Sequence, residues 1–264
     1  MRAIPHTWIN AFNRLSIWKR QVRFEDYKIQ VPNFDRWLYV KLHALGLMGS
    51  EEREFLRRHA RAGMTVLDIG ANIGLYSMLL AELVGGDGKV FAFEPDPVLF
   101  EAAVVNAQQN EKSEVLELQN LALGSRSGQA TLYRSSFNSG DNRLSASATH
   151  KDAVSVEIAR LDDVLGDTPI DLVKMDVQGW EAEVLRGMEQ ILKNNSEMTI
   201  YFEYWPEGLR RAGEQVSAPL EILRQCGFSI WFPEGAKPLT TPEMENLEKK
   251  YSGNRFVNLM ARRA

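Results

Sequence analysis

The chain has 264 residues, of which 44% are hydrophobic and 25% charged, as in one large α/β domain or one domain with an appendage. Its net charge of −4 provides no global positive field to recruit nucleic acid, so we expect no nucleic-acid partner. A single cysteine, Cys226, excludes an internal disulfide and a cysteine-rich metal site, and we expect a cytoplasmic protein.

The first part of the chain lacks a regular alternation of strands and helices, and we expect an N-terminal extension over residues 1–60 that is a candidate substrate lid. Trp8, Phe12 and Leu15 lie at helical spacing, which predicts a helix packed on the domain. The alternative for this segment is peripheral contact with a membrane surface. Short strands are expected over residues 24–31 and 37–40, and a helix over 51–60.

From residue 61 onward, apolar runs typical of buried strands alternate with helical patterns, which predicts a Rossmann-like, mostly parallel sheet with helices on both faces. We expect strands over residues 64–69, 90–93, 115–121, 170–175, 198–202, 228–232 and 256–260. We expect helices over residues 74–84, 97–110, 180–192 and 218–226. The polar stretch before the final strand, 233–255, is long enough for that strand to be antiparallel.

Residues 129–134 and 154–159 alternate like the two strands of an inserted hairpin. The connection between them is rich in Ser, Asn and Gly, which predicts a mobile loop over residues 135–150 and one wall of a substrate site. Its donors for a polar substrate are Asn138, Ser139, Gly140, Asn142 and Arg143, and an ordinary solvated loop is the alternative. His150 is a candidate base in this loop, although a lone loop histidine is usually just exposed.

A glycine turn, VLDIGANIG (66–74), lies where the first regular strand meets the first helix, and ligands of open α/β sheets bind at such a crevice. Gly70 removes a Cβ so that a ligand can approach the backbone, and the helix N-terminus suits a carboxylate. Gly74 lets this helix pack close to the sheet. Glu94 ends the second strand, where its carboxylate can bind ribose hydroxyls. The predicted cofactor-binding residues are Asp68, Gly70, Asn72, Gly74, Glu94, Pro95, Asn120, Ala122 and Asp176.

The turn reads Gly-Ala-Asn-Ile-Gly and therefore lacks the middle glycine that a dinucleotide pyrophosphate requires. S-adenosylmethionine has no phosphate and carries an ammonium, a carboxylate and a sulfonium. The turn offers an acid and a helix N-terminus for these charged groups, and a second acid can bind the ribose. The sequence thus predicts S-adenosylmethionine as cofactor. A nucleotide-dependent oxidoreductase and a non-catalytic cofactor-binding module are the alternatives.

Six segments occur in a distinctive order and spacing: VLDIGANIGLYS (66–77), FEPDP (93–97), NLALGSRSGQATLY (120–133), ARLDDVL (159–165), IDLVKMDVQGWEAEVLRGM (170–188) and FEYWP (202–206). Together they resemble the FkbM-type family of class I S-adenosylmethionine-dependent methyltransferases. The resemblance implies a class I methyltransferase domain over residues 61–264 that methylates a hydroxyl of a sugar, glycan, glycolipid or secondary metabolite. Gln178 departs from the family, which usually has an acid there.

Methyl transfer to a hydroxyl benefits from a general base, and Asp176, at the end of the fourth strand, is the best-placed carboxylate. Glu203, at the end of the fifth strand, is the next candidate. The two carboxylates together could bind Mg²⁺, which would lower the pKa of the hydroxyl. The alternative for Asp176 is that it only caps the helix beginning near Gln178.

Overall fold

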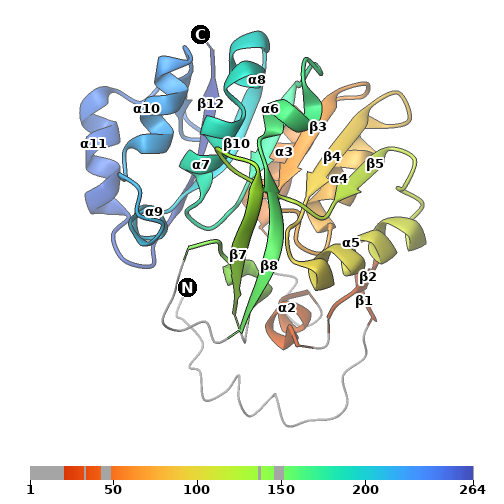
Figure 1. The fold of residues 1–264 in the computed structure, drawn as a ribbon. Coiled ribbons are helices and arrows are strands. Elements are labelled where there is room, and N and C mark those ends of the chain that lie inside the picture. Colours follow the sequence, from red (N-terminus) through yellow and green to blue (C-terminus); the bar gives the residue numbers. More distant parts are fainter. Residues whose placement is uncertain (1–20, 33, 43–48, 136–137, 146–151, 264) are drawn as a thin grey trace.

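The computed structural model describes residues 21–32, 34–42, 49–135, 138–145 and 152–263. Its centre is a seven-stranded sheet whose strands lie in the order β11-β12-β10-β9-β3-β4-β5 (Figure 1). In that order the strands are β11 (Ser229–Trp231), β12 (Val257–Arg262), β10 (Thr199–Tyr204), β9 (Leu172–Met175), β3 (Thr65–Ile69), β4 (Lys89–Phe93) and β5 (Leu116–Gln119). All neighbours from β10 to β5 are parallel, whereas β12 is antiparallel to both β10 and β11. The predicted mostly parallel sheet is confirmed.

Helices cover both faces of this sheet, and each face has its own buried core. One core is formed with α3 (Ser50–His59), α4 (Leu75–Val84) and α5 (Pro97–Gln109). The other is formed with α6 (Leu161–Leu165), α7 (Glu181–Gly187), α8 (Glu189–Asn194), α9 (Pro206–Arg211), α10 (Ala218–Gln225) and α11 (Thr241–Lys250). The sheet is thus buried on both faces, which explains the near-continuous apolar runs in its central strands.

The part of the extension that the structure describes differs from the expected pair of strands. The segment 24–31 contains a turn at Glu25, with φ of +50°, between β1 (Gln21–Phe24) and β2 (Tyr27–Gln30). The strand expected over 37–40 is wrong, because α2 (Arg36–Val40) begins there. Its first turn is capped by Asp35, whose carboxylate accepts the Leu38 N–H at 2.8 Å.

The hairpin packs on α5 through side-chain amides: Asn106 accepts the Gln30 N–H at 2.6 Å, and Asn110 accepts the Lys28 N–H at 2.9 Å. The helix expected over 51–60 is confirmed as α3. The predicted helix near the start of the chain, with Trp8, lies outside the described residues. The division of the chain at residue 60 stays a prediction.

Two further expectations need correction. The helix expected over 180–192 is interrupted at Met188, which ends α7 and precedes α8. The polar stretch 233–255 contains α11, which begins with a capping box of Thr240 and Glu243. The predicted hairpin is confirmed as β7 (Gly128–Arg134) and β8 (Asp152–Ala159), which form a three-stranded sheet with β6 (Ala122–Leu123).

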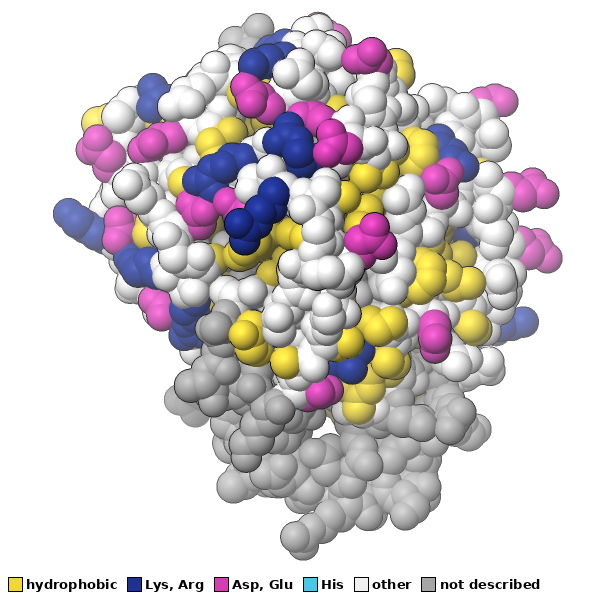
Figure 2. Space-filling model, viewed as in Figure 1, with side chains coloured by type: hydrophobic (Ala, Val, Ile, Leu, Met, Phe, Trp, Pro, Cys, Tyr) yellow, Lys and Arg dark blue, Asp and Glu magenta, His cyan; other side chains and the backbone are white. Residues whose placement is uncertain are grey.

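Acidic and basic side chains are interspersed over the described surface on the face that Figure 2 shows. Among the described helices, none combines the length and the apolar character needed to cross a membrane.

Candidate active site

The turn between β3 and α4 is held against the neighbouring strands by its backbone. The N–H groups of Gly70 and Ala71 both donate to the carbonyl of Phe93 at 3.0 Å. Gly70 has a φ of +84°, and a Cβ there would lie 2.0 Å from the carbonyl oxygen of Asp176. The end of β9 thus occupies the space that a side chain at this position would need, and the approach of a ligand to the Gly70 backbone stays a prediction.

Gly74 precedes α4 with a φ of +80°, and a Cβ there would lie 3.2 Å from the Cβ of Ala103 in α5. This glycine therefore permits close packing of two helices, rather than packing of α4 on the sheet as predicted. Gly74 is the N-cap residue of α4, and no side-chain hydrogen bond caps this helix. The first turn of this ten-residue helix thus suits a ligand carboxylate.

Glu94, directly after β4, is 5% exposed and fixed by two backbone donors. The Asn72 N–H donates to Oε2 at 2.8 Å, and the Asp96 N–H donates to Oε1 at 2.9 Å. Each carboxylate oxygen keeps a further lone pair for a hydroxyl, which fits the ribose of an adenosyl group. Burial raises the pKa of Glu94 to about 8, against the two backbone hydrogen bonds.

The other residues expected at the cofactor surround this acid. Asn120 donates its side-chain amide to the carbonyls of Glu94 and Pro95 at 2.8 and 2.9 Å, so it holds the turn that carries the acid. Ala122 is buried in β6. Asn72 has a φ of +53°, and its amide donates to Ser139 Oγ at 3.1 Å. Their contacts with a cofactor stay predictions.

Asp68 is fully buried in β3 and has partners within the protein. Ser77 Oγ donates to Asp68 Oδ2 at 2.6 Å, and Lys174 Nζ lies 3.3 Å from Oδ1. Burial opposes the charge of Lys174, but Asp68 and the acids Glu52 and Asp176 raise its pKa. This arrangement favours a supporting role for Asp68 beneath the turn over a direct contact with a ligand.

Asp176 and Glu203 are joined by the side chain of Gln178. The amide of Gln178 donates to Asp176 Oδ1 at 2.7 Å and to Glu203 Oε1 at 3.1 Å. Asp176 is half-buried, whereas Glu203 is 8% exposed. Burial and the neighbouring carboxylate of Asp176 raise the pKa of Glu203 well above its usual range. Asp176 does not cap α7, which begins at Glu181 after Trp180.

The donor set gives no support to the expected Mg²⁺ site. Within the described part of the chain, no group of three or more His, Cys, Asp or Glu side chains is arranged to hold a metal ion. Between the two predicted ligands lies an amide N–H group, which donates hydrogen bonds and does not ligate. The candidate base His150 lies outside the described residues.

Two further acids, the partly buried Glu52 and the fully buried Glu181, were not predicted as site residues from the sequence. Burial raises the pKa of Glu52, on α3, to about 7, and its charge interacts with Lys174 and Asp176. Burial also raises the pKa of Glu181 to about 7, and its Oε2 has no hydrogen-bond partner. Glu52 comes from a segment with no recognisable motif, so only its folded position reveals it.

The described part of the loop predicted to be mobile is folded onto this edge. Ser139 donates its N–H to Asp35 Oδ2 at 2.8 Å. Asn142 donates to Asp96 Oδ2 at 3.0 Å, and Arg134 pairs with both oxygens of Asp96 at 2.8 Å. Several of the predicted substrate donors are thus already used to fasten the loop to the protein.

Trp205, after β10, is packed rather than open to a substrate. It is 6% exposed, and the guanidinium groups of Arg143 and Arg211 lie 5.2 and 5.3 Å from its ring centroid. Its Nε1 donates to the carbonyl of Gly253 at 3.0 Å. The indole therefore links the end of β10 to the loop that precedes β12.

Comparisons with known proteins find related methyltransferases. Residues 68–230 match the methyltransferase FkbM domain. The chain is 29% identical over 218 residues to the methyltransferase sdnD of Sordaria araneosa, covering 66% of this chain and 80% of sdnD. It is 27% identical over 190 residues to the 2-O-methyltransferase NoeI of Sinorhizobium fredii, covering 65% and 76%. A solved candidate O-methyltransferase of Klebsiella pneumoniae shares the fold with a TM-score of 0.50 at 13% identity, covering 84% of each chain.

Proposed function

The chain belongs to the FkbM methyltransferase family, and we propose that it is an S-adenosylmethionine-dependent O-methyltransferase acting on a hydroxyl of a sugar, glycan, glycolipid or secondary metabolite. The observation that carries the proposal is the position of Glu94. Its carboxylate is fixed by the Asn72 and Asp96 amides at the edge of the sheet where Asp176 and Glu203 also lie. The similarity to a 2-O-methyltransferase supports oxygen as the acceptor atom.

In this proposal the residues at the carboxyl ends of β3 and β4 would hold the cofactor. The first turn of α4 would receive its carboxylate, and Glu94 would accept hydrogen bonds from its ribose hydroxyls. Asn120 and Ala122 would border its adenine. When bound, S-adenosylmethionine supplies an already activated methyl group, so the main task of the protein is alignment of the acceptor oxygen.

Asp176 is the proposed base because it is the more exposed of the paired carboxylates. Its carboxylate would take the proton that the acceptor hydroxyl loses as the oxygen gains the methyl group. Glu203, whose pKa is raised, would hold a proton and offer a hydrogen bond to the acceptor. The Gln178 amide, which donates a hydrogen bond to each of them, holds Asp176 and Glu203 next to each other.

Replacing Glu94 by Ala should weaken the affinity for S-adenosylhomocysteine about 10- to 100-fold, because two hydrogen bonds to the ribose hydroxyls are lost. Isothermal titration calorimetry measures this change. Glu101→Ala, an exposed position on α5, is the matched control and should leave the affinity unchanged. Equal affinities of wild type and Glu94→Ala would remove Glu94 from the cofactor site.

Replacing Asp176 by Asn should lower turnover about 10²- to 10⁴-fold while changing cofactor affinity little, since the base is lost and the cofactor contacts are kept. A screen of glycans and macrolides with tritium-labelled S-adenosylmethionine identifies an acceptor for this assay. Unaltered turnover would exclude Asp176 as the base, and binding of NAD in place of S-adenosylhomocysteine would overturn the proposed function.

A further inference from the structure

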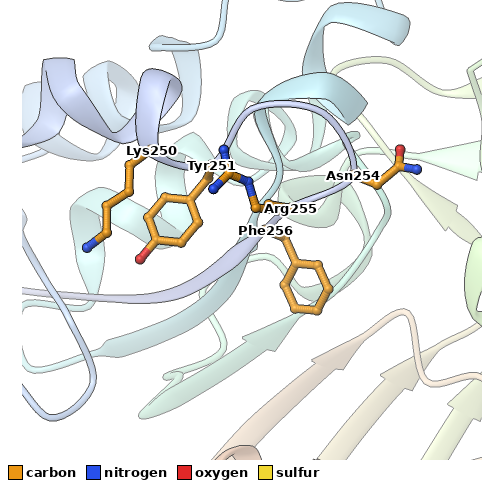
Figure 3. Close-up of a pocket in the computed structure, with 5 residues that line it drawn as sticks. All are labelled: Lys250, Tyr251, Asn254, Arg255 and Phe256. Atoms are coloured by element: carbon orange, nitrogen blue, oxygen red, sulfur yellow. The ribbon is translucent and has the colours of Figure 1, made fainter. Parts of the chain in front are cut away.

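A pocket with a volume of about 390 Å³ lies in the loop between α11 and β12. Its lining side chains are Lys250, Tyr251, Asn254, Arg255 and Phe256 (Figure 3). The hollow is largely open to solvent, and its lining residues all come from the segment 250–256. None of these residues belongs to the predicted cofactor or methyl-transfer site.

The pocket adjoins the edge of the sheet where Asp176 and Glu203 lie, because β12 begins where the antiparallel β10 ends. Val257 pairs with Tyr204, and Asn258 pairs with Glu203, so Phe256 immediately precedes the residue beside the end of β10. The hydrogen bond from Trp205 to Gly253 fixes the loop to the same edge. A ligand that extends beyond Glu203 along this edge would therefore reach the pocket.

The pocket combines open aromatic surface with positive charge. Phe256 is 54% exposed, the largest exposure among the large hydrophobic side chains that the structure describes. Lys250 Nζ lies 5.3 Å from the ring centroid of Tyr251. Arg255 donates to Ser252 Oγ at 3.0 Å and to the Ser252 carbonyl at 3.3 Å.

Neither cation is neutralised by a carboxylate in the described part of the chain. The hydrogen bonds of Arg255 go to uncharged groups of Ser252, and Lys250 lies over the aromatic rings of Phe232 and Tyr251. The acid two residues before Lys250, Glu248, is paired with Arg210. The pocket thus has a surplus of positive charge beside its aromatic rings.

We propose that this pocket is a subsite for an anionic sugar unit of the acceptor, next to the unit that is methylated. The aromatic rings of Tyr251 and Phe256 would contact the apolar face of the sugar, and Lys250 and Arg255 would pair with its carboxylate or phosphate. This subsite rests on the proposed function, because it assigns the acceptor class of the same enzyme.

The test is a saturation-transfer NMR titration of the full chain, saturated with S-adenosylhomocysteine, using three probes. Methyl β-D-glucuronide and glucose 6-phosphate carry the two anionic groups, and methyl β-D-glucoside is the neutral reference. We expect at least one anionic probe to bind about tenfold more tightly than the glucoside, and the tighter one identifies the anion. The double variant Lys250→Ala, Arg255→Ala should bind all three equally.

The matched control is Arg126→Ala, an exposed cation before β7, which should keep the preference for an anion. Phe256→Ala should weaken the binding of all three probes. Equal binding of the three probes to the wild type, or a preference that survives in the double variant, would overturn the subsite. Calorimetry with S-adenosylhomocysteine separates the two proposals: a failure to bind it overturns the proposed function, whereas a lack of anion preference overturns the subsite alone.

Discussion

Gln178 shows how one side chain can set the chemistry at the edge of the sheet where two acids meet. Its amide donates to two carboxylates, Asp176 and Glu203, that would otherwise repel each other. An ionised acid at this position would have no such donor. The neutral amide therefore bridges the two acids, and the nearby charge of Lys174 interacts with both of them.

Replacing Gln178 by Glu should lower the free energy of unfolding by about 1–3 kcal/mol at pH 8, because a third carboxylate joins a partly buried pair. The loss should shrink at pH 5, where the cluster can hold protons. Urea denaturation at both pH values measures the effect, and Gln178→Ala, which adds no charge, is the control. The same stability for Gln178→Glu and wild type at both pH values would contradict this view of the amide.

At the level of elements, the segment 138–145 connects several parts of the chain to the turn between β3 and α4. Ser139 contacts both Asn72 and Asp35, and Asn142 and Arg134 hold Asp96, which caps the start of α5. These contacts bring the N-terminal segment, the β7–β8 hairpin and two helix starts together.

Replacing Arg134 by Ala should lower the free energy of unfolding by about 1.5–3 kcal/mol, because the fully buried Asp96 loses a two-point charged partner. Chemical denaturation measures the loss, and Arg126→Ala on the preceding turn is the control. A loss no larger than that of the control would mean that the contact between Arg134 and Asp96 does not stabilise the fold.

The sequence predicted the elements whose pattern depends on burial in the central sheet. The apolar runs of β3, β4 and β9 and the helix after Gly74 were found because both faces of the sheet are covered. The strand expected over 37–40 was wrong because its apolar residues also suit a short helix, and Asp35 caps that helix. The helix α11 was missed because it is largely polar, although its Thr240–Glu243 capping box is visible in the sequence.

The candidate site was predictable where motifs follow strands and unpredictable where distant segments meet. Glu94, Asp176 and Glu203 lie at the carboxyl ends of β4, β9 and β10, which run parallel in one sheet, so their shared edge follows from the fold. Glu52 and Asp35 reach the same region from the N-terminal segment, which carries no motif. Their positions depend on tertiary packing, which no local pattern records.

Across the whole molecule, several buried acids have pKa values above their ordinary range. The pKa values of Glu52 and Glu181 are about 7 and that of Glu94 is about 8, in each case chiefly through burial. These three acids therefore bind more protons in the folded protein than in the unfolded chain between about pH 4.5 and pH 8. The free energy of unfolding should consequently fall as pH rises through this range.

Thermal or chemical denaturation of the protein without cofactor between pH 5 and pH 9 measures this dependence. Glu94→Gln cannot ionise at this position, so the variant should lose less stability than wild type as pH rises towards 8. Stability that increases from pH 5 to pH 8 in wild type would show that these acids are not held in their protonated forms.

The most direct measurement of the central claim is a crystal structure of the chain with S-adenosylhomocysteine. We expect both ribose hydroxyls within hydrogen-bond distance of the Glu94 carboxylate, the ligand carboxylate at the start of α4, and the sulfur facing Asp176. An adenosyl group bound away from Glu94, or a ligand that leaves the turn at Gly70 vacant, would contradict the account.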